Sequence, residues 1–173
     1  MTYEPCFEAL DKLVTAILPQ VHNIVLLDNA SASSIQVSSR YRDIKSLCQI
    51  MLKENMGIAY AHNRSIEWAD ENNADYVLLL DQDSVPRSNM VKLMLSNIQN
   101  TEGESVVAIG PSYEDPRTNI RSYFMVSKFG FPQRYKPRND CKPKKLVSVS
   151  FLISSGSLIS MDALRQYGGM RSE

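Results

Sequence analysis

Two acidic side chains, Asp81 and Asp83, lie two residues apart directly after a five-residue apolar run, residues 76–80. The run predicts a buried strand. A spacing of two places both carboxylates on one side of an extended chain. Two neighbouring carboxylates repel each other and favour a hard divalent cation, Mg²⁺ or Mn²⁺, which also takes phosphate oxygens. The pair therefore predicts a metal site that holds a phosphorylated substrate.

The same pattern has a simpler interpretation, in which Asp81 and Asp83 only end a strand and cap the following helix. Aspartate is common in turns, so an isolated Asp-x-Asp motif is most often structural. The context favours a site here, because a second acid, Asp28, closes another apolar run at residues 24–27. In open α/β sheets, ligands bind beyond the carboxyl ends of the strands, which is where both acidic motifs are expected to lie.

Alternating apolar runs and amphipathic segments predict the elements that position these acids. We expect helices at about residues 4–18, 58–72, 88–98 and 160–168, and strands at 24–27, 49–52, 76–80, 106–109 and 146–153. Buried strands that alternate with crossover helices predict an α/β fold with a mostly parallel central sheet. The whole chain, residues 1–173, is expected to form a single domain.

Three segments are predicted from composition rather than periodicity. Residues 29–39, rich in Ser and Ala, are expected to form a loop, and residues 154–157 form a Ser-Ser-Gly-Ser turn. Residues 112–145 predict a long excursion with irregular strand. From Arg117 to Lys145 the excursion carries nine Lys or Arg and one acid. Such a stretch is usually a solvated loop, and its functional interpretation is an acceptor-binding or membrane-surface patch.

Composition excludes several classes of protein. Hydrophobic residues make up 43% and charged residues 22%, as in ordinary globular domains. A formal net charge of zero gives no electrostatic reason to expect a nucleic-acid partner. The three cysteines form no Cys-x-x-Cys pair, which argues against a zinc site or a disulfide framework. With no apolar leader and no spanning segment, we expect a cytoplasmic protein that associates peripherally with the inner face of the cell membrane.

Four motifs, in their order and spacing, resemble the family-two inverting glycosyltransferases of the GT-A fold. They are Leu-Leu-Asp-Asn-Ala-Ser (26–31), Asn-Met-Gly-Ile-Ala-Tyr-Ala-His-Asn (55–63), Ala-Asp-Tyr-Val-Leu-Leu-Leu-Asp-Gln-Asp-Ser-Val-Pro (74–86) and Ile-Gly-Pro (109–111). The Asp-Gln-Asp-Ser form together with Ile-Gly-Pro is similar to the rhamnosyltransferase branch. The resemblance covers nearly the whole chain and implies a three-layer α/β/α sandwich of the GT-A type.

This resemblance implies a metal-dependent transferase that moves a sugar from a nucleotide donor with inversion. The expected donor is dTDP-rhamnose, the metal is Mn²⁺ or Mg²⁺, and the acceptor is a cell-surface polysaccharide such as an O-antigen or a lipid-linked saccharide. Asp83 and Asp81 would hold the metal, Asp81 would face the sugar or ribose, and Asp28 would contact the base or ribose. The implied nucleotide-sugar site comprises Asp28, Asn29, Ser31, Asn55, Gly57, Asn63, Asp81 and Gly156.

The sequence departs from the family pattern at both ends. The first strand is reduced to residues 1–5, and the acidic motif that carries the general base is expected shortly after Gly168 and Gly169, beyond Glu173. A base of this kind contributes about 10²–10⁴-fold to the rate. We therefore expect a fragment of a longer enzyme, whose own activity would be weak. The alternative is a catalytically inactive remnant or a module that only binds nucleotide sugars.

A second alternative is a phosphohydrolase of the haloacid-dehalogenase type. That family also begins with an apolar strand followed by Asp-x-Asp, and Asp81 would then be the nucleophile that forms an aspartyl-phosphate. It needs a second acidic pair later in the chain, and the sequence has none C-terminal to Asp115. The glycosyltransferase interpretation is therefore the stronger of the two.

Overall fold

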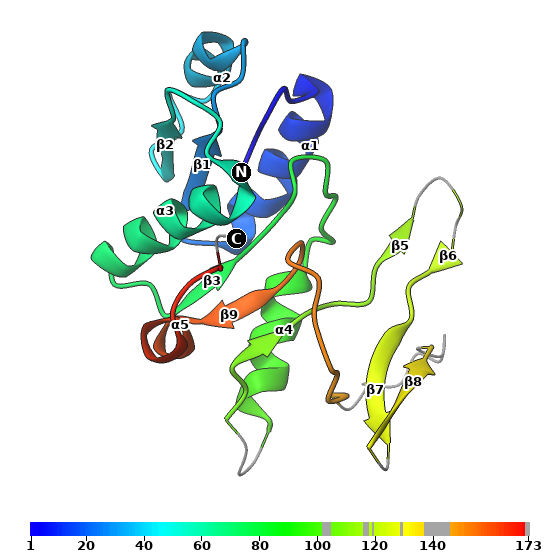
Figure 1. The fold of residues 1–173 in the computed structure, drawn as a ribbon. Helices are drawn as coiled ribbons and strands as arrows, with labels where there is room; N and C mark the ends of the chain where they lie inside the picture. The colour runs from blue at the N-terminus through cyan, green and yellow to red at the C-terminus, as the bar shows by residue number, and fades with distance from the viewer. Residues whose placement is uncertain (102–104, 116–117, 119, 129, 137–145, 172–173) are drawn as a thin grey trace.

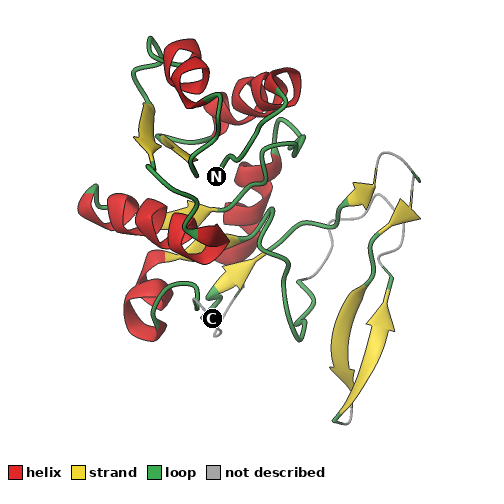
Figure 2. Cartoon of the chain, turned by 45° about the horizontal axis from the view of Figure 1, so that its top comes forward, coloured by secondary structure: helices red, strands yellow, loops and turns green. Residues whose placement is uncertain are grey.

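A computed structural model describes residues 1–101, 105–115, 118, 120–128, 130–136 and 146–171. Helices cover both faces of a central layer of strands, and an arm of antiparallel strands extends from one side (Figures 1 and 2). The elements are α1 (Phe7–Ile17), η1 (Leu18–Gln20), β1 (Ile24–Asp28), α2 (Ser34–Arg40), β2 (Leu47–Met51), α3 (Gly57–Glu71), β3 (Tyr76–Leu78), α4 (Met90–Gln99), β4 (Ala108–Ile109), β5 (Glu114–Asp115), β6 (Ile120–Arg121), β7 (Phe124–Lys128), β8 (Phe131–Tyr135), β9 (Leu158–Ser160) and α5 (Met161–Tyr167).

The N-terminal part of the central layer is the parallel pair β1 and β2. α1 and α2 pack over it and form one hydrophobic core with it. α1 does so because Leu10, Leu13 and Val14 recur at helical spacing and form one buried stripe. Leu80, which follows β3, packs against the same core. This contact joins the two parts of the central layer through side chains.

The C-terminal part of the layer is the three-stranded ladder β3-β9-β4. α3 and α5 pack on the face that carries Val77 and Ile159, whereas α4 packs on the opposite face with Leu78 and Leu158. Alternate residues of each strand therefore face different helices, as the period of two in a strand requires. The predicted α/β/α fold is confirmed. β9 runs antiparallel to both of its neighbours, so β3 and β4 are parallel to each other.

Residues 2 and 3 lie between these two ladders. The backbone N–H of Thr2 donates to the carbonyl of Leu27 (2.7 Å), and Asn29 donates back to the carbonyl of Thr2 (2.8 Å). The next residue, Tyr3, donates its backbone N–H to Oε1 of Gln82 (2.9 Å). β1 and β3 belong to separate hydrogen-bonded sheets. This short segment therefore links the end of β1 to the loop that follows β3.

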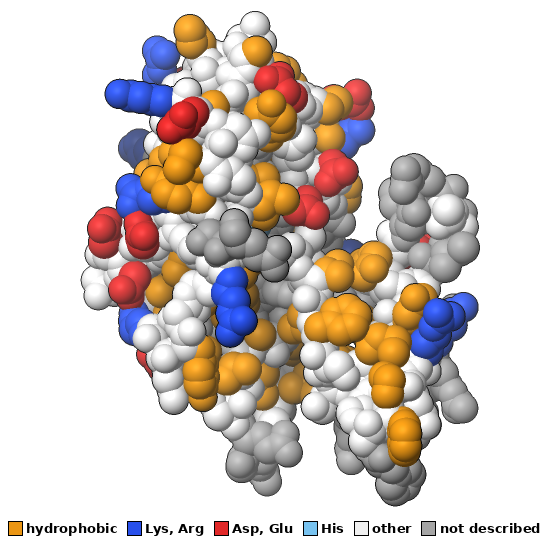
Figure 3. All heavy atoms as spheres, in the orientation of Figure 1, with side chains coloured by type: hydrophobic (Ala, Val, Ile, Leu, Met, Phe, Trp, Pro, Cys, Tyr) orange, Lys and Arg blue, Asp and Glu red, His pale blue; other side chains and the backbone are white. Residues whose placement is uncertain are grey.

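The arm consists of β5 to β8, within residues 114–135. β5 pairs with β6, and β7 pairs with β8 in a hairpin that runs from Phe124 beside Tyr135 to Lys128 beside Phe131. The described side chains of β8 are all exposed. Figure 3 shows hydrophobic side chains gathered along this arm. The excursion predicted for residues 112–145 is therefore built of antiparallel strands where it is described, and residues 137–145, with much of the basic stretch, lie outside the described residues.

Two element predictions were wrong. Residues 29–39 were expected to form a loop, but they include most of α2, whose Val37 packs in the first core together with Tyr41 four residues later. Residues 146–153 were expected to form a strand, but they have no regular strand structure. Instead, Ser150 donates its backbone N–H to the carbonyl of Met125 in the arm (2.8 Å). The strand of this region is β9, after the turn at residues 154–157.

Among the described residues, no helix is both long enough and apolar enough to cross a membrane.

Truncation of Leu10 is expected to destabilise the domain. Its side chain is fully buried in the first core, so Leu10→Ala should lower the free energy of unfolding by about 2–5 kcal/mol, the range for leucine truncation in a packed core. Urea denaturation followed by circular dichroism measures this change. Leu93→Ala is the matched control, because Leu93 on α4 is 53% exposed and its truncation should change stability by less than about 0.5 kcal/mol. Equal effects of both substitutions would contradict this core.

Candidate active site

Both acidic motifs lie at carboxyl ends of strands, as predicted. Asp28 is the last residue of β1, and Asp81 comes three residues after Leu78, the end of β3. The segment at residues 2–3 connects them, because Thr2 donates its hydroxyl to Oδ1 of Asp28 (3.1 Å) and Tyr3 exchanges hydrogen bonds with Gln82. The two motifs therefore belong to one continuous hydrogen-bonded region.

Asp28 is fully buried, and its carboxylate organises the turn that follows β1. Oδ1 accepts hydrogen bonds from the hydroxyls of Thr2 (3.1 Å) and Ser31 (2.5 Å), and Oδ2 accepts one from the backbone N–H of Ser31 (3.0 Å). The hydroxyl of Ser31 also accepts a hydrogen bond from the backbone of Glu4 (2.9 Å). A contact between Asp28 and a nucleotide would require one of these bonds to be exchanged.

Asn29, Asn55 and Gly57 are brought together at the start of α3. The Asn29 side chain donates to Oδ1 of Asn55 (2.8 Å) and accepts from the backbone of Met56 (3.0 Å), while Oδ1 of Asn55 also accepts from the backbone of Gly57 (3.0 Å). Gly57 has φ +80°, a conformation that favours glycine. These contacts lock the loop after β1 to the N-terminus of α3, as the predicted shared site requires.

Asp81 and Asp83 are both exposed. Their loop is held through its backbone, because Asp81 donates its N–H to Oγ of Ser155 (3.1 Å), and Oγ of Ser84 lies 3.0 Å from the same hydroxyl. Within the part of the chain that the structure describes, no group of three His, Cys, Asp or Glu side chains could hold an ion. Two open carboxylates nevertheless fit a cation that takes its other ligands from substrate phosphates and water.

Gly156 fixes the Ser-Ser-Gly-Ser turn against the end of β3. Its backbone N–H donates to the carbonyl of Leu79 (2.7 Å), and its φ of +86° favours glycine. A Cβ atom at this position would lie 3.2 Å from Pro111. The turn therefore carries Ser155 to the Asp81 loop, and Gly156 contributes by its shape rather than by a side chain.

The family of this chain follows from its similarity to known proteins. Across residues 2–168, the sequence matches the sequence model of Glycosyl transferase family 2. The chain belongs to glycosyl transferase family 2. The match includes both acidic motifs and the Ser-Ser-Gly-Ser turn, and it replaces the haloacid-dehalogenase interpretation of Asp81.

Named relatives of this family-2 chain include the dTDP-rhamnosyl transferase RfbF of Shigella flexneri, which is 27% identical over 174 residues. That alignment covers 100% of this chain and 56% of the relative, so the chain spans about half of the relative's length.

Two solved structures have a similar fold. S. aureus TarS 1–349 has a TM-score of 0.58 at 15% identity, covering 96% of this chain and 47% of that one. The mannosyltransferase PcManGT of Pyrobaculum calidifontis, solved in complex with GDP-Man and Mn²⁺, has a TM-score of 0.52 at 19% identity, covering 67% of this chain and 34% of that one. Together with the family match, these similarities establish the GT-A fold of the family-2 chain.

In this family-2 domain, the side chain of Asn63 bonds to the segment after α5. Its amide donates to the backbone carbonyl of Met170 (2.8 Å) and accepts from the backbone N–H of Met170 (2.7 Å). A Cβ atom on the neighbouring Gly169 would overlap Oδ1 of Asn63. Asn63 therefore anchors the segment after α5 to α3. The general base is predicted beyond Glu173, which itself lies outside the described residues.

Sequence reasoning missed several residues of this family-2 site. Thr2, Gln82 and Ser155 each hold an acidic motif in place, and neither Thr2 nor Gln82 was predicted to take part. Ser155 lies in the Ser-Ser-Gly-Ser turn that the sequence predicts at residues 154–157, so the turn was identified although its contact with Asp81 was not. His62 on α3 is buried, and burial lowers the pKa of its imidazole.

Substitution of Asn63 is expected to release the segment after α5. Asn63→Ala removes both hydrogen bonds to Met170, so amide exchange at Met170 should accelerate by about tenfold or more, which corresponds to a loss of roughly 1.4 kcal/mol. Hydrogen–deuterium exchange with mass spectrometry measures this change. Asn97→Ala is the matched control, because the Asn97 amide donates to the carbonyl of Leu93 one turn earlier within α4. Unchanged exchange in the Asn63 variant would show that the anchor is not formed in solution.

Proposed function

We propose that this chain is the donor-binding part of a glycosyltransferase that uses dTDP-rhamnose and a divalent cation, Mn²⁺ or Mg²⁺. The observation that carries the proposal is the pair of exposed carboxylates, Asp81 and Asp83, on a loop whose backbone is fixed by Ser155. The rhamnose donor is supported by the Shigella flexneri relative, which is a dTDP-rhamnosyl transferase. The metal is supported by the Pyrobaculum mannosyltransferase, which was solved with Mn²⁺ and GDP-Man.

The proposed roles come from the family resemblance and are compatible with where the side chains lie. Asp83 and Asp81 are open to solvent and would hold the cation on the donor diphosphate, where it would neutralise charge on the leaving group. Asp81 would also face the sugar or ribose. Asn55 and Gly57 form a tight turn, and Gly57, which has no side chain, would let the backbone approach the nucleotide. Asp28 would contact the base or ribose and would hold its turn through Ser31.

The proposed reaction is an in-line displacement at the anomeric carbon of the donor sugar. An acceptor hydroxyl oxygen forms the new bond to that carbon, and the bond from the carbon to the diphosphate oxygen breaks. The nucleoside diphosphate leaves with the bonding electron pair, and the hydroxyl proton passes to a general base. The configuration at the anomeric carbon is thereby inverted. The proposed acceptor is a cell-surface polysaccharide or a lipid-linked saccharide.

Calorimetric titration tests the donor site without requiring turnover. dTDP, UDP and GDP would each be titrated into the full chain, with Mn²⁺ and with EDTA. We expect dTDP to bind in the presence of Mn²⁺, and at least about 100-fold more weakly in EDTA, because two carboxylates without a cation repel the diphosphate. Selective binding of UDP or GDP would keep the site but change the donor. Absence of binding to all three by a folded protein would overturn the proposal.

A further inference from the structure

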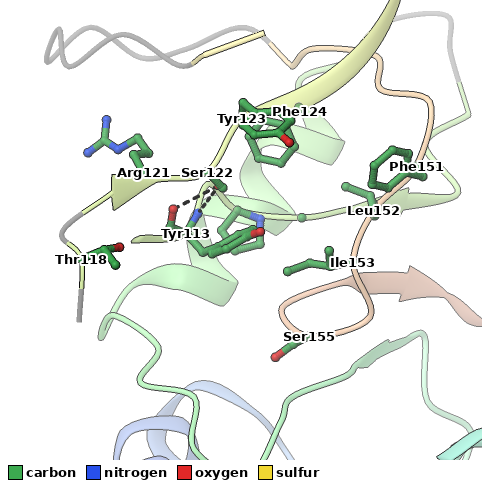
Figure 4. Close-up of a pocket in the computed structure, with 12 residues that line it drawn as sticks. Tyr113, Thr118, Arg121, Ser122, Tyr123, Phe124, Phe151, Leu152, Ile153 and Ser155 are labelled. Atoms are coloured by element: carbon green, nitrogen blue, oxygen red, sulfur yellow. Dashed lines mark hydrogen bonds between the residues drawn. The ribbon is translucent and has the colours of Figure 1, made fainter. Parts of the chain in front are cut away.

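A cavity of about 560 Å³ lies between the arm and the segment that leads into β9. Its size is within the range of small-molecule sites. Figure 4 shows side chains of the arm on one side of it and the side chains of residues 151–153 on the other, with Ser155 nearer the body of the domain. Its lining includes Tyr113, Ser122, Tyr123, Phe151 and Ser155.

The lining combines aromatic faces with hydroxyl groups. Tyr123 and Phe151 are 52% and 60% exposed, so their rings are available to a ligand. Tyr113 and Tyr123 each add a phenolic hydroxyl, and Ser155 adds an aliphatic hydroxyl. A sugar ring has the same two-sided chemistry, with an apolar C–H face and polar hydroxyl edges. The lining therefore offers a saccharide both kinds of contact, with the aromatic rings facing its C–H face and the tyrosine hydroxyls at its polar edge.

The aromatic side of the cavity is built rigidly. Ser122 is buried and joined to Tyr113 by three hydrogen bonds: its backbone N–H and its hydroxyl both donate to the Tyr113 carbonyl (2.9 and 3.1 Å), and its Oγ accepts from the Tyr113 N–H (3.3 Å). The guanidinium of Arg134 lies over the Tyr123 ring, 4.7 Å from its centroid. Because these contacts pre-order the wall, a ligand loses less entropy when it binds there.

The cavity reaches the candidate metal site through one residue. Ser155 lines the cavity, and its Oγ also accepts the backbone N–H of Asp81. A ligand in the cavity therefore lies next to the loop that would hold the donor diphosphate. We propose that this cavity binds the saccharide acceptor, stacking a sugar ring against Tyr123 and Phe151 and presenting a hydroxyl toward the Asp81 loop. This inference rests on the proposed function and adds the place and chemistry of its second substrate.

The test uses an array of immobilised tri- to pentasaccharides of defined structure, probed with the tagged full chain in the presence of dTDP and Mn²⁺. We expect the wild-type chain to be retained on at least one oligosaccharide. Tyr123→Ala and Phe151→Ala should each reduce that retention about tenfold, the loss expected for one aromatic contact. Tyr167→Ala, which removes a 74% exposed aromatic ring from α5 outside the cavity, is the matched control and should change retention by less than about twofold.

Calorimetry with dTDP and Mn²⁺ on the same proteins separates the two proposals. Tyr123 and Phe151 are exposed, so both variants should fold and bind dTDP as the wild type does. Wild-type protein that binds dTDP but is retained on no oligosaccharide would overturn the acceptor site and leave the donor site standing. Equal losses in Tyr167→Ala and the cavity variants would also overturn it. Retention of oligosaccharides without any nucleotide binding would overturn the donor site and, with it, the assignment of the bound sugar as an acceptor.

Discussion

Asp83→Ala is expected to reduce Mn²⁺-dependent affinity for dTDP by at least about 100-fold, or roughly 2.7 kcal/mol, and not to weaken the binding in EDTA further, because removal of one carboxylate lessens the repulsion of the diphosphate. Loss of a residue that only supports a metal ligand already costs about 10–100-fold, so loss of a carboxylate ligand should cost more. The Asp83 side chain is exposed, so its removal should not disturb packing. Calorimetric titration at fixed Mn²⁺ measures the affinity.

Two further variants sharpen this test. Asp83→Asn keeps the shape of the side chain and removes its charge, and it should lose nearly as much affinity as Asp83→Ala because the cation needs the charge. Asp43→Ala removes another exposed carboxylate, in the connection between α2 and β2, and should bind dTDP as the wild type does. If Asp83→Ala keeps its Mn²⁺-dependent affinity, Asp83 is not a ligand and the Asp-x-Asp motif is only a turn.

Asp28→Ala is expected to lower the free energy of unfolding by about 3 kcal/mol. Hydrogen bonds to a charged group contribute about 1.5–3 kcal/mol each, although their contributions do not add fully. The Asp28 carboxylate accepts three such bonds while fully buried, so its removal leaves the two Ser31 donors without their acceptor, whereas the Thr2 hydroxyl keeps its bond to the carbonyl of Leu27 (3.3 Å). Urea denaturation at neutral pH measures the change, and Asp43→Ala should shift stability by less than about 0.5 kcal/mol.

Asp28→Asn gives an intermediate case that tests the geometry. The amide keeps one oxygen acceptor, so the two hydroxyl donors can retain their partner, while the backbone N–H of Ser31 faces an amide group that cannot accept. We expect a loss between zero and that of Asp28→Ala. A urea midpoint of Asp28→Ala equal to that of the wild type would show that this carboxylate does not hold the turn, and that its importance, if any, lies in nucleotide contact.

The elements that the sequence predicted well are those with long, regular patterns. α3 and β1 were expected almost where they lie, because one has apolar residues at helical spacing and the other is a continuous apolar run. α2 was missed because its serines suggested a loop, although Val37 and Tyr41 mark one helical face. β9 was missed because it is only three residues long. A strand was wrongly expected at residues 146–153, which contact the arm through the bond from Ser150 to Met125 instead of pairing in the sheet.

The sequence predicted the acidic residues of the site but not the residues that hold their loops in place. Asp81 and Asp83 could be placed at a strand end because the apolar run before them fixes where the chain leaves the core. The hydroxyl that holds their loop comes from Ser155, 74 residues away, and the link to Asp28 comes from Thr2, 26 residues away. Such contacts depend on how the ladders are arranged in space. A single sequence carries no local pattern that reports this arrangement.

The segment at residues 2–3 has a consequence for how this domain responds to its donor. The proposed nucleotide contacts after β1 and the proposed metal ligands after β3 belong to two ladders that share no strand pairing and are linked through Thr2 and Tyr3. A nucleotide that spans both loops would therefore add a further link between these two parts, beside the residue 2–3 segment and the Leu80 contact. Donor binding and the association of the two parts are then thermodynamically linked. Filling the donor site should therefore raise both the stability of the protein and the cooperativity of its unfolding.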